Sequence, residues 1–334
     1  MKYTKLGNTD IDISKICLGC MGFGKAGTMH DWTLDKNSTE KIVKHALDLG
    51  INFFDTANSY SNGTSEEYLG LSIKRNIPRD KVVLASKVYF NEGRLSKEAI
   101  LREIEGTLKR LGTDYLDLYI IHRFDYNTSI EETMEALHTL VVSGKVRAIG
   151  ASAMYGYQFH NMQISAEKNG WTKFCAMENH YNLLYREDER ELIPICNQQN
   201  VSLIPYSPLA GGHLTRNSWD SDTLRSKTDI VLEGKYGSMK DQNIKIINRV
   251  AELAEKYNCK MSQIAIAWHW KKGVSSPIIG ATNEKHLNDA VNALNITLTD
   301  EDIYYLEELY IPHPIVGAID KNPEPGTILI DVKK

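Results

Sequence analysis

Four side chains suited to acid–base chemistry each follow a short apolar run, and these are Asp55, Tyr60, Lys87 and His122. A phenol exchanges protons poorly near neutral pH because its ordinary pKa is about 10. A neighbouring ammonium favours the phenolate, so we expect Lys87 to lower the pKa of Tyr60 while Asp55 holds Lys87 in place. A hydrogen bond from His122 would orient a carbonyl toward Tyr60. The set predicts proton delivery to a carbonyl oxygen that becomes an alkoxide, with electrons supplied by a cofactor.

Apolar runs that alternate with amphipathic segments would position these residues. The predicted strands are Ile16–Gly19, Asn52–Phe54, Val82–Ser86, Leu116–Ile121, Val146–Gly150, Phe174–Met177, Val201–Tyr206 and Pro277–Gly280. Near-continuous apolar runs are typical of parallel strands covered on both faces. Eight strand–helix units predict an α/β fold, a single (βα)8 TIM barrel over residues 1–334, with the four side chains at the carboxyl ends of its strands.

The intervening segments carry helix signals. Apolar residues recur on one face of Ser96–Leu111, at Ile100, Ile104, Leu108 and Leu111. Two pairs indicate capping boxes, Thr64 with Glu67 and Ser129 with Glu132.

Several segments lie outside the minimal barrel. Tyr3–Leu6 and Ile11–Ser14 predict a hairpin that turns at Gly7 and Asn8. Two long loops, Gly22–Asp35 and Gly211–Gly237, and a Pro-containing tail at 311–334 interrupt the strand–helix pattern. Long ordered loops are usually functional, so we expect the two loops at the carboxyl face to shape the site.

Composition narrows the class of partner. The chain has 39 Lys and Arg residues against 43 Asp and Glu residues, a net charge of −4, which argues against nucleic acid or an anionic membrane. No apolar run approaches the roughly 20 residues that span a bilayer. The five scattered cysteines fit a reducing cytoplasm. Cys17 and Cys20 lie three apart on a predicted strand and so face opposite sides, which favours packing, and no metal-binding motif is present.

The constellation resembles that of the aldo-keto reductases, whose catalytic tetrad is an Asp, a Tyr, a Lys and a His. The matching motifs are Phe54-Asp55-Thr56-Ala57 with Tyr60, Ala85-Ser86-Lys87 and Ile121-His122-Arg123, and the resemblance runs from about Tyr3 to about Tyr310. It implies a hairpin that closes the bottom of the barrel, an NADPH/NADP cofactor extended across the mouth, and Tyr60 as general acid. His122 is the alternative acid, since its ordinary pKa of about 6.5 lies nearer neutrality.

The resemblance also implies which residues hold the cofactor. They are Gly22, Ser152, Glu178, Tyr206, Ser207, Leu209, Gly211, Gly212, Arg216, Gly280, Thr282, Lys285 and His286. Tyr206 would stack on the nicotinamide and Ser152 would contact its carboxamide. Glu178 stands where a Gln is usual; as a carboxylate it would only accept hydrogen bonds and would favour the oxidised, cationic ring. The family often has an Arg near Thr282, and its absence predicts a modest preference for NADP over NAD.

The expected substrate is a small-molecule carbonyl compound, bound by Phe23, Trp32, Tyr89, Phe90, Arg123 and Phe124. The leading interpretation is a carbonyl reductase of broad aldehyde or ketone range. One alternative is a nicotinamide-binding regulatory subunit of a larger complex, and another is a related enzyme acting on sugar phosphates. Retention of the whole tetrad favours an enzyme.

Overall fold

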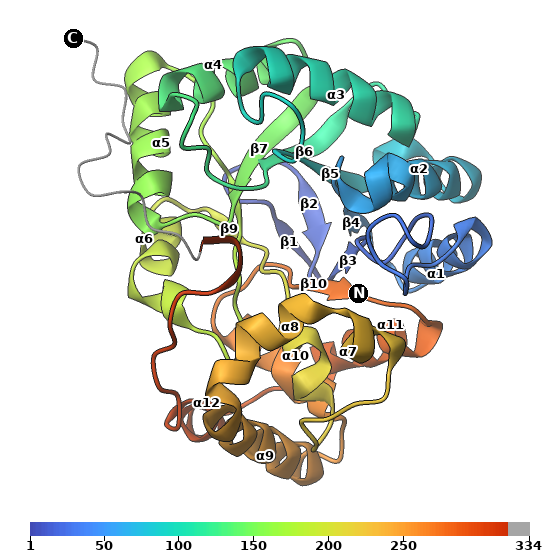
Figure 1. Cartoon of the computed structure of the whole chain (residues 1–334), viewed down its shortest axis with the longest axis vertical. Coiled ribbons are helices and arrows are strands. Elements are labelled where there is room, and N and C mark those ends of the chain that lie inside the picture. Colours follow the sequence, from blue (N-terminus) through green and yellow to red (C-terminus); the bar gives the residue numbers. More distant parts are fainter. Residues whose placement is uncertain (320–334) are drawn as a thin grey trace.

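A computed structural model describes residues 1–319, and within them a curled parallel sheet is surrounded by helices (Figure 1). Eight strands pair in parallel in the order β10-β3-β4-β5-β6-β7-β8-β9. Their bounds are β3 Cys17–Gly19, β4 Phe53–Asp55, β5 Val83–Val88, β6 Leu116–Ile121, β7 Val146–Ser152, β8 Ala176–Glu178, β9 Ser202–Leu203 and β10 Ile278–Gly280. The Ile278 N–H donates to the Pro205 carbonyl at 3.0 Å and so links the two edges of the sheet. The architecture is consistent with the predicted barrel.

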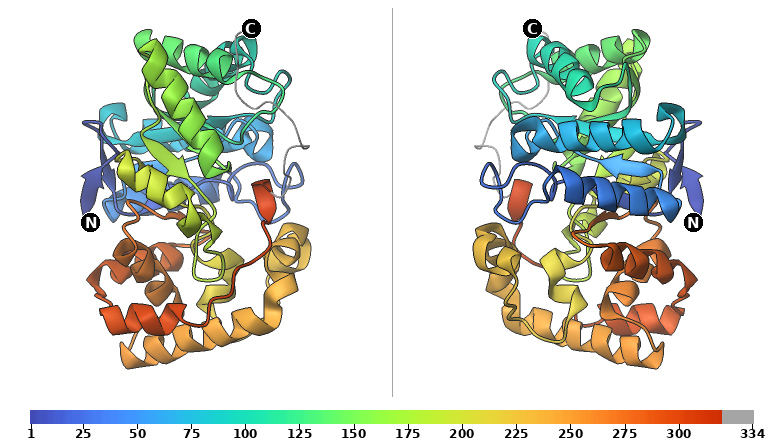
Figure 2. Two further views of the ribbon diagram at one scale, coloured as in Figure 1. Left: turned by 90° about the vertical axis from the view of Figure 1, so that its left-hand side faces the viewer. Right: turned by 90° about the vertical axis from the view of Figure 1, so that its right-hand side faces the viewer.

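Helices follow the strands along the chain. Their bounds are α1 Lys36–Asp48, α2 Thr64–Asn76, α3 Lys97–Leu111, α4 Ile130–Val142, α5 Gly156–Asn169, α6 Leu192–Gln198, α7 Leu224–Thr228, α8 Ile230–Tyr236, α9 Lys240–Lys256, α10 Met261–Lys271, α11 Glu284–Asn292 and α12 Asp300–Glu307. Both side views in Figure 2 place α9 and α12 at the end of the molecule opposite α3 and α4. None of the helices in residues 1–319 is long and apolar enough to cross a membrane.

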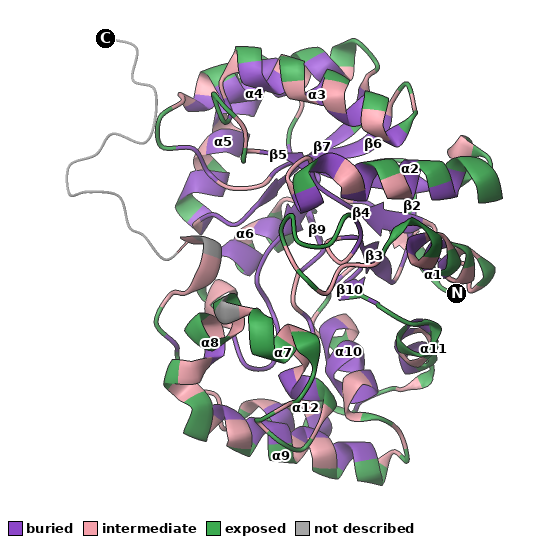
Figure 3. Ribbon diagram, turned by 45° about the vertical axis from the view of Figure 1, so that its right-hand side comes forward, coloured by how far each residue is buried: buried purple, intermediate pink, exposed green. Residues whose placement is uncertain are grey.

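Two apolar clusters lie on the two faces of the curled sheet, and Figure 3 shows that the strands and the inward faces of the helices are buried. The smaller one is the interior cluster, with the strand residues Cys17, Phe53, Val83, Ala85, Leu118, Ile120, Ala148, Ala176, Ile204 and Ile278. The hairpin of β1 Tyr3–Lys5 and β2 Asp12–Ser14 is antiparallel, and the residues Leu6, Ile11 and Ile13 beside its strands join this cluster. Cys17 belongs to the interior cluster and Cys20 to the larger outer one, so the two cysteines face opposite sides as predicted.

The helix signals are confirmed only in part. Ser96 caps α3, whose predicted apolar face is buried. Ser129 caps α4, although the Glu132 side chain accepts a hydrogen bond from the Lys97 N–H instead of closing a capping box. The box predicted at Thr64 is wrong, because Gly63 in a left-handed conformation is the N-cap of α2 and Thr64 is the first helical residue.

The ends of two strands, β5 and β9, differ from the predicted ends. β5 runs through Lys87 to Val88, since an ion pair satisfies the buried ammonium and polarity no longer marks the end of the strand. β9 is shorter than predicted, and Tyr206 lies beyond it in an isolated parallel bridge with His180. The segment 211–237 is not a plain loop, because it contains most of the short helix η4 Ala210–Thr215 together with α7 and α8. The predicted tail lies outside the described residues from 320 onward.

Candidate active site

Five candidates in or just after strands each follow a residue of the interior cluster by two positions. Because strand side chains alternate between faces, residues two apart point the same way. The pairs are Asp55 after Phe53, Lys87 after Ala85, His122 after Ile120, Glu178 after Ala176 and Tyr206 after Ile204. The apolar interior therefore ends in a polar layer at the carboxyl ends of the strands, where barrel enzymes carry their catalytic residues.

Lys87 joins the members of this layer. Its ammonium Nζ lies 2.7 and 2.5 Å from the two carboxylate oxygens of Asp55, 2.9 Å from the Thr56 carbonyl oxygen and 3.3 Å from Tyr60 Oη. Burial alone would lower the pKa of Lys87, but the negative charges of Asp55 and Glu178 raise it well above the usual value. Lys87 therefore remains an ammonium, and the expected pair with Asp55 is present.

His122 lies beside Tyr60, with ring centroids 5.8 Å apart and the rings nearly perpendicular at 79°. Its backbone N–H donates to the Val88 carbonyl at 2.9 Å, which ties the end of β6 to that of β5. Burial, helped by the positive charges of Lys87 and Arg123, holds the pKa of His122 well below the ordinary value. His122 is thus a neutral imidazole near pH 7, and the structure brings all four predicted catalytic residues together.

The pKa of Tyr60 moves against the prediction. Burial raises it above the ordinary phenol value, and the charges of Asp55 and Glu178 add to the rise, while Lys87 lowers it by less. The expectation of a lowered pKa is therefore wrong for this site. Tyr60 keeps its proton at physiological pH and, as it accepts from Lys87, its own hydrogen is free to be donated to a ligand.

Glu178 is a second buried carboxyl group beside Lys87. Its Oε2 lies 3.4 Å from Lys87 Nζ, and the side chain is 4% exposed. Burial and then the charge of Asp55 raise its pKa to about 8 against the pull of Lys87. The expectation that Glu178 only accepts hydrogen bonds is wrong near neutral pH, because a protonated carboxyl also donates. Ser152 Oγ donates to the Glu178 carbonyl oxygen at 2.7 Å and so joins the ends of β7 and β8.

The ring of Tyr206 is supported by residues that sequence reasoning missed. His180 stacks on it with centroids 5.2 Å apart and 9° between planes, and Nε2 of His180 bonds the Tyr236 hydroxyl at 2.8 Å. Lys235 Nζ lies 5.1 Å from the Tyr206 centroid, and burial lowers its pKa to about 8. The dense polar run after β8 could have indicated His180, but Lys235 comes from a helix in a segment predicted as a loop.

Around the turn after β9, backbone conformation is unusual. Ser207 has a φ of 55°, and its carbonyl accepts from Asn182 Nδ2 at 2.9 Å. Gly211 has a φ of 63°, and a side chain there would collide with Leu232 of α8. Arg216 donates to the Gly212 carbonyl at 2.8 Å. Leu209 beside them is half-buried.

The remaining cofactor candidates lie on two other segments. Gly22 accepts at its carbonyl from the Leu34 N–H at 2.7 Å, with the Trp32 ring packed against it. An exposed group surrounds the start of α11, where Asn283 is the N-cap, and its members are Gly280, Thr282, Lys285 and His286. Whether these segments act together stays a prediction.

One of the substrate candidates, Phe90, adjoins His122, and two others contact Phe90. Phe90 meets its ring edge-on at 5.0 Å, Tyr89 meets Phe90 at 5.1 Å, and the Arg123 guanidinium lies 4.8 Å from the Phe90 centroid. Elsewhere, Phe124 packs on Tyr126, and Phe23 is fully buried in the outer cluster. Trp32 lies beneath the Arg225 guanidinium at 4.6 Å, so the two long segments touch.

Some buried polar atoms in and outside this layer have no hydrogen-bond partner among the residues that the structure describes. Within residues 1–319, the buried atoms without a hydrogen-bond partner include His122 Nδ1, Glu178 Oε2, Asn179 Oδ1, Trp32 Nε1 and Arg216 Nε. Such atoms are rarely left unpaired in folded proteins. Donors and acceptors of these kinds match in type the carboxamide and phosphates of a nicotinamide dinucleotide. No group of three or more His, Cys, Asp or Glu in the described part of the chain is placed to hold a metal ion.

Comparison with known proteins agrees with this geometry. A model of the Aldo/keto reductase family matches residues 15–311. A Schizosaccharomyces pombe protein, provisionally named an aryl-alcohol dehydrogenase, is 45% identical over 95% of this chain and 98% of its own. Versiconal hemiacetal acetate reductase of Aspergillus parasiticus is 41% identical over 94% of this chain and 98% of its own.

A solved structure supports the fold. A thermostable aldo-keto reductase in complex with the inhibitor epalrestat has a TM-score of 0.75 and 28% sequence identity, covering 93% of this chain and 100% of that one. The chain described here belongs to the aldo/keto reductase family, a family of oxidoreductases.

Proposed function

We propose that this protein is an NADP(H)-dependent reductase that converts aldehydes or ketones to alcohols, acting as one barrel domain in the cytoplasm on a small-molecule substrate. The observation that carries the proposal is the contact of Lys87 Nζ with both the Asp55 carboxylate and Tyr60 Oη, beside a neutral His122. The bound nicotinamide supplies hydride. The protein's own task is then to place the carbonyl and to deliver a proton.

Each tetrad residue has a defined part in that task. His122, as a neutral imidazole, donates a hydrogen bond to the carbonyl oxygen and orients it. Tyr60 donates its phenol proton to the same oxygen as negative charge develops there. Lys87 stabilises the resulting phenolate, and Asp55 holds Lys87 in position. The high resting pKa of Tyr60 means that the proton is available at every physiological pH.

The cofactor's groups match the unpaired atoms in kind. Ser152, Glu178 and Asn179 would hold the carboxamide, and Tyr206 would pack against the ring. The turn from Ser207 to Gly212 would meet the pyrophosphate, and Arg216 would reach the additional phosphate that NADPH has and NADH lacks. Thr282, Lys285 and His286 at the start of α11 would take the adenosine phosphate, since a helix N-terminus attracts anions.

Aromatic carbonyl compounds are the substrate class favoured by the surroundings. Tyr89 and Phe90 lie beside His122 and offer apolar, edge-on contacts to a ring. The relatives named for aryl alcohols and for a versiconal ester point the same way. Arg123 against Phe90 would suit a polar substituent and keeps sugar phosphates worth testing.

The test is steady-state turnover with NADPH and a panel of benzaldehydes, aliphatic aldehydes and sugar phosphates. We expect NADPH consumption to depend on the aldehyde, with aromatic members turned over fastest. Tight NADPH binding without turnover of any member would instead support a regulatory subunit. Failure to bind either nicotinamide cofactor would contradict both functions.

A further inference from the structure

We propose that Glu178 is a proton switch that responds to the charge of the cofactor, holding a proton beside the reduced, neutral nicotinamide and releasing it to solvent beside the oxidised, cationic one. This inference rests on the proposed function, because it requires a nicotinamide at the mouth of the barrel. Glu178 stands where the resemblance leads us to expect a Gln, and the side chain of Gln has no titratable proton to release.

The geometry places one ammonium between two buried carboxyl groups. A lysine has three N–H donors, and those of Lys87 are taken by Asp55, the Thr56 carbonyl and Tyr60 Oη. At 3.4 Å, Glu178 Oε2 receives attraction from Lys87 but no hydrogen bond, and it has no other hydrogen-bond partner among residues 1–319. Asp55, whose pKa burial also raises, therefore holds the ammonium more closely than Glu178 does, and the two carboxyl groups interact with each other.

Electrostatics then assign the proton. With all three groups ionised, the pocket would carry net negative charge away from water, and a buried carboxylate in that position neutralises by taking up a proton. Both oxygens of Asp55 lie within 2.7 Å of Lys87 Nζ whereas Glu178 Oε2 lies 3.4 Å away, so the proton goes to Glu178, whose pKa is raised to about 8. The pair titrates as a unit, and near pH 7 it carries one proton.

The other groups around Glu178 do not compensate its charge. From β3, Cys17 is a buried thiol whose pKa is raised, and from the turn after β9 Tyr206 is a phenol whose pKa is raised. Tyr60 and His122 are neutral near pH 7. The cation Lys235 lies over Tyr206, so a positive ring near Glu178 would be a new and strong influence.

Linkage gives the consequence for binding. A cationic ring stabilises the Glu178 carboxylate, so its proton leaves as the oxidised cofactor binds. Affinity for NADP⁺ should then rise with pH, by up to about tenfold per unit, until the pH passes about 8. NADPH lacks the ring charge. Both cofactors share the same phosphates, so phosphate titration cancels in the ratio of their dissociation constants.

Proton release can be counted directly by titration calorimetry at pH 7 in buffers of different ionisation enthalpy. A carboxyl group whose pKa is raised to about 8 is mostly protonated at that pH. For the wild type we expect NADP⁺ binding to release more protons than NADPH binding. Glu178→Gln should remove the part of this difference that comes from Glu178 and leave the part from Lys235, whose pKa is also about 8. Glu135→Gln removes an exposed carboxylate paired with Lys97 at 3.0 Å, and should behave as wild type.

A pH series separates the possible outcomes. In the wild type, the ratio of the NADP⁺ to the NADPH dissociation constant should fall between pH 6 and 8. In Glu178→Gln it should fall by less, because only Lys235 then titrates beside the ring, and an equal fall in both proteins would overturn the switch. A flat ratio in the wild type, with both cofactors bound, would overturn the switch and leave the proposed function intact. Absence of binding by both cofactors would overturn the proposed function itself. Gln has the shape of a protonated Glu, and a matching melting temperature near pH 5 checks that the variant folds.

Discussion

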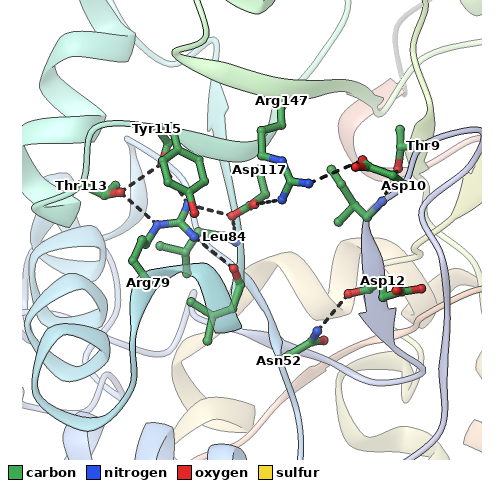
Figure 4. Close-up of polar contacts among 12 residues, drawn as sticks. Thr9, Asp10, Asp12, Asn52, Arg79, Leu84, Thr113, Tyr115, Asp117 and Arg147 are labelled. Atoms are coloured by element: carbon green, nitrogen blue, oxygen red, sulfur yellow. Dashed lines mark hydrogen bonds and ion pairs between the residues drawn. The ribbon is translucent and has the colours of Figure 1, made fainter.

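Both ends of the barrel contain a buried carboxylate paired with a cation, but the pairing is complete at one end and incomplete at the other. At the amino ends of the strands, Asp117 receives Arg79 and Arg147, each at 2.7 Å, and the Leu84 N–H at 2.9 Å (Figure 4). Both of its oxygens have partners, and the cations outnumber it. At the carboxyl ends, one ammonium serves two carboxyl groups, and an oxygen of Glu178 is left unpaired.

This difference separates a structural network from a chemical one. The Asp117 network, defined by Asp117, Arg79 and Arg147, joins the starts of three neighbouring strands and has nothing left to offer a ligand. The network of Asp55, Lys87 and Glu178 retains a movable proton and an unpaired oxygen. Complete pairing favours stability, whereas incomplete pairing in a buried place is a cost that a ligand can remove.

The largest expected effect is a loss of turnover when Tyr60, which accepts from Lys87 of the chemical network, is replaced. Tyr60→Phe removes the proton and keeps the ring, so turnover should fall about 10²–10⁴-fold while NADPH affinity stays near wild type. Stopped-flow turnover on one aromatic aldehyde at saturating NADPH measures this. His122→Gln is the matched comparison and should retain more activity, because His122 positions the carbonyl without supplying the proton. The reverse order would assign the acid to His122.

The next largest expected effect is a loss of stability when Asp117 of the structural network is replaced. Asp117→Asn leaves Arg79 and Arg147 without their buried charge partner, so the free energy of unfolding should fall by about 2–4 kcal/mol. Denaturant unfolding measures the loss. Turnover per folded molecule should be unchanged. Asp12→Asn is the control, because its pair with Lys5 is exposed and should contribute at most about 1 kcal/mol. Lost activity in a stable Asp117→Asn protein would show that the two ends are coupled.

A smaller effect tests whether the chemical network costs stability. The pKa of Glu178 rises from an ordinary 4.5 to about 8 on folding, so the folded state holds more protons between these values. Wild-type stability should therefore decrease as pH rises through that window. Glu178→Gln lacks this penalty and should be more stable than wild type at pH 8.5 by about 1–3 kcal/mol. Thermal melts of cofactor-free protein at pH 5 and pH 8.5 check it; an equal difference at both pH values would contradict it.

The smallest expected effect concerns the phosphate side of the mouth. Arg216 has a buried Nε without a partner among residues 1–319, so Arg216→Gln should weaken NADPH binding about three- to tenfold, the net value of one typical hydrogen bond. NADH binding should change less, because NADH lacks the additional phosphate. Lys227→Gln, at an exposed residue near Asp222, is the control. Fluorescence titration of both cofactors decides it, and equal losses for NADPH and NADH would place Arg216 elsewhere than at that phosphate.

Sequence reasoning succeeded where chemistry follows strand order. β6 begins and ends as predicted, and the spacing of Asp55, Lys87 and His122 brought them to one mouth because interior positions repeat every second residue. It failed on protonation. The raised pKa of Tyr60 depends on burial and on Glu178, which lies more than a hundred residues away and is positioned only by the closed order of strands.

The contacts of Tyr206 show the same limit. The sequence indicated a strand end at Tyr206. It did not indicate that His180 stacks on the Tyr206 ring or that Lys235 of α8 lies over it. The segment containing Lys235 has few apolar residues at regular spacing, so its helices are stabilised by what they pack on. Such partners become evident only when the chain is folded.

The two-position step between each interior residue and its functional neighbour constrains how this protein can evolve. Replacing Glu178 by Gln alters the chemistry while the side chain still points inward after Ala176. Inserting or deleting one residue between Ala176 and Glu178 would turn the side chain outward, because a single step exchanges the faces of a strand. We therefore expect lineages of this barrel to diversify at the mouth by substitution, and to accept length changes in the segments after it, such as 22–35 and 211–237.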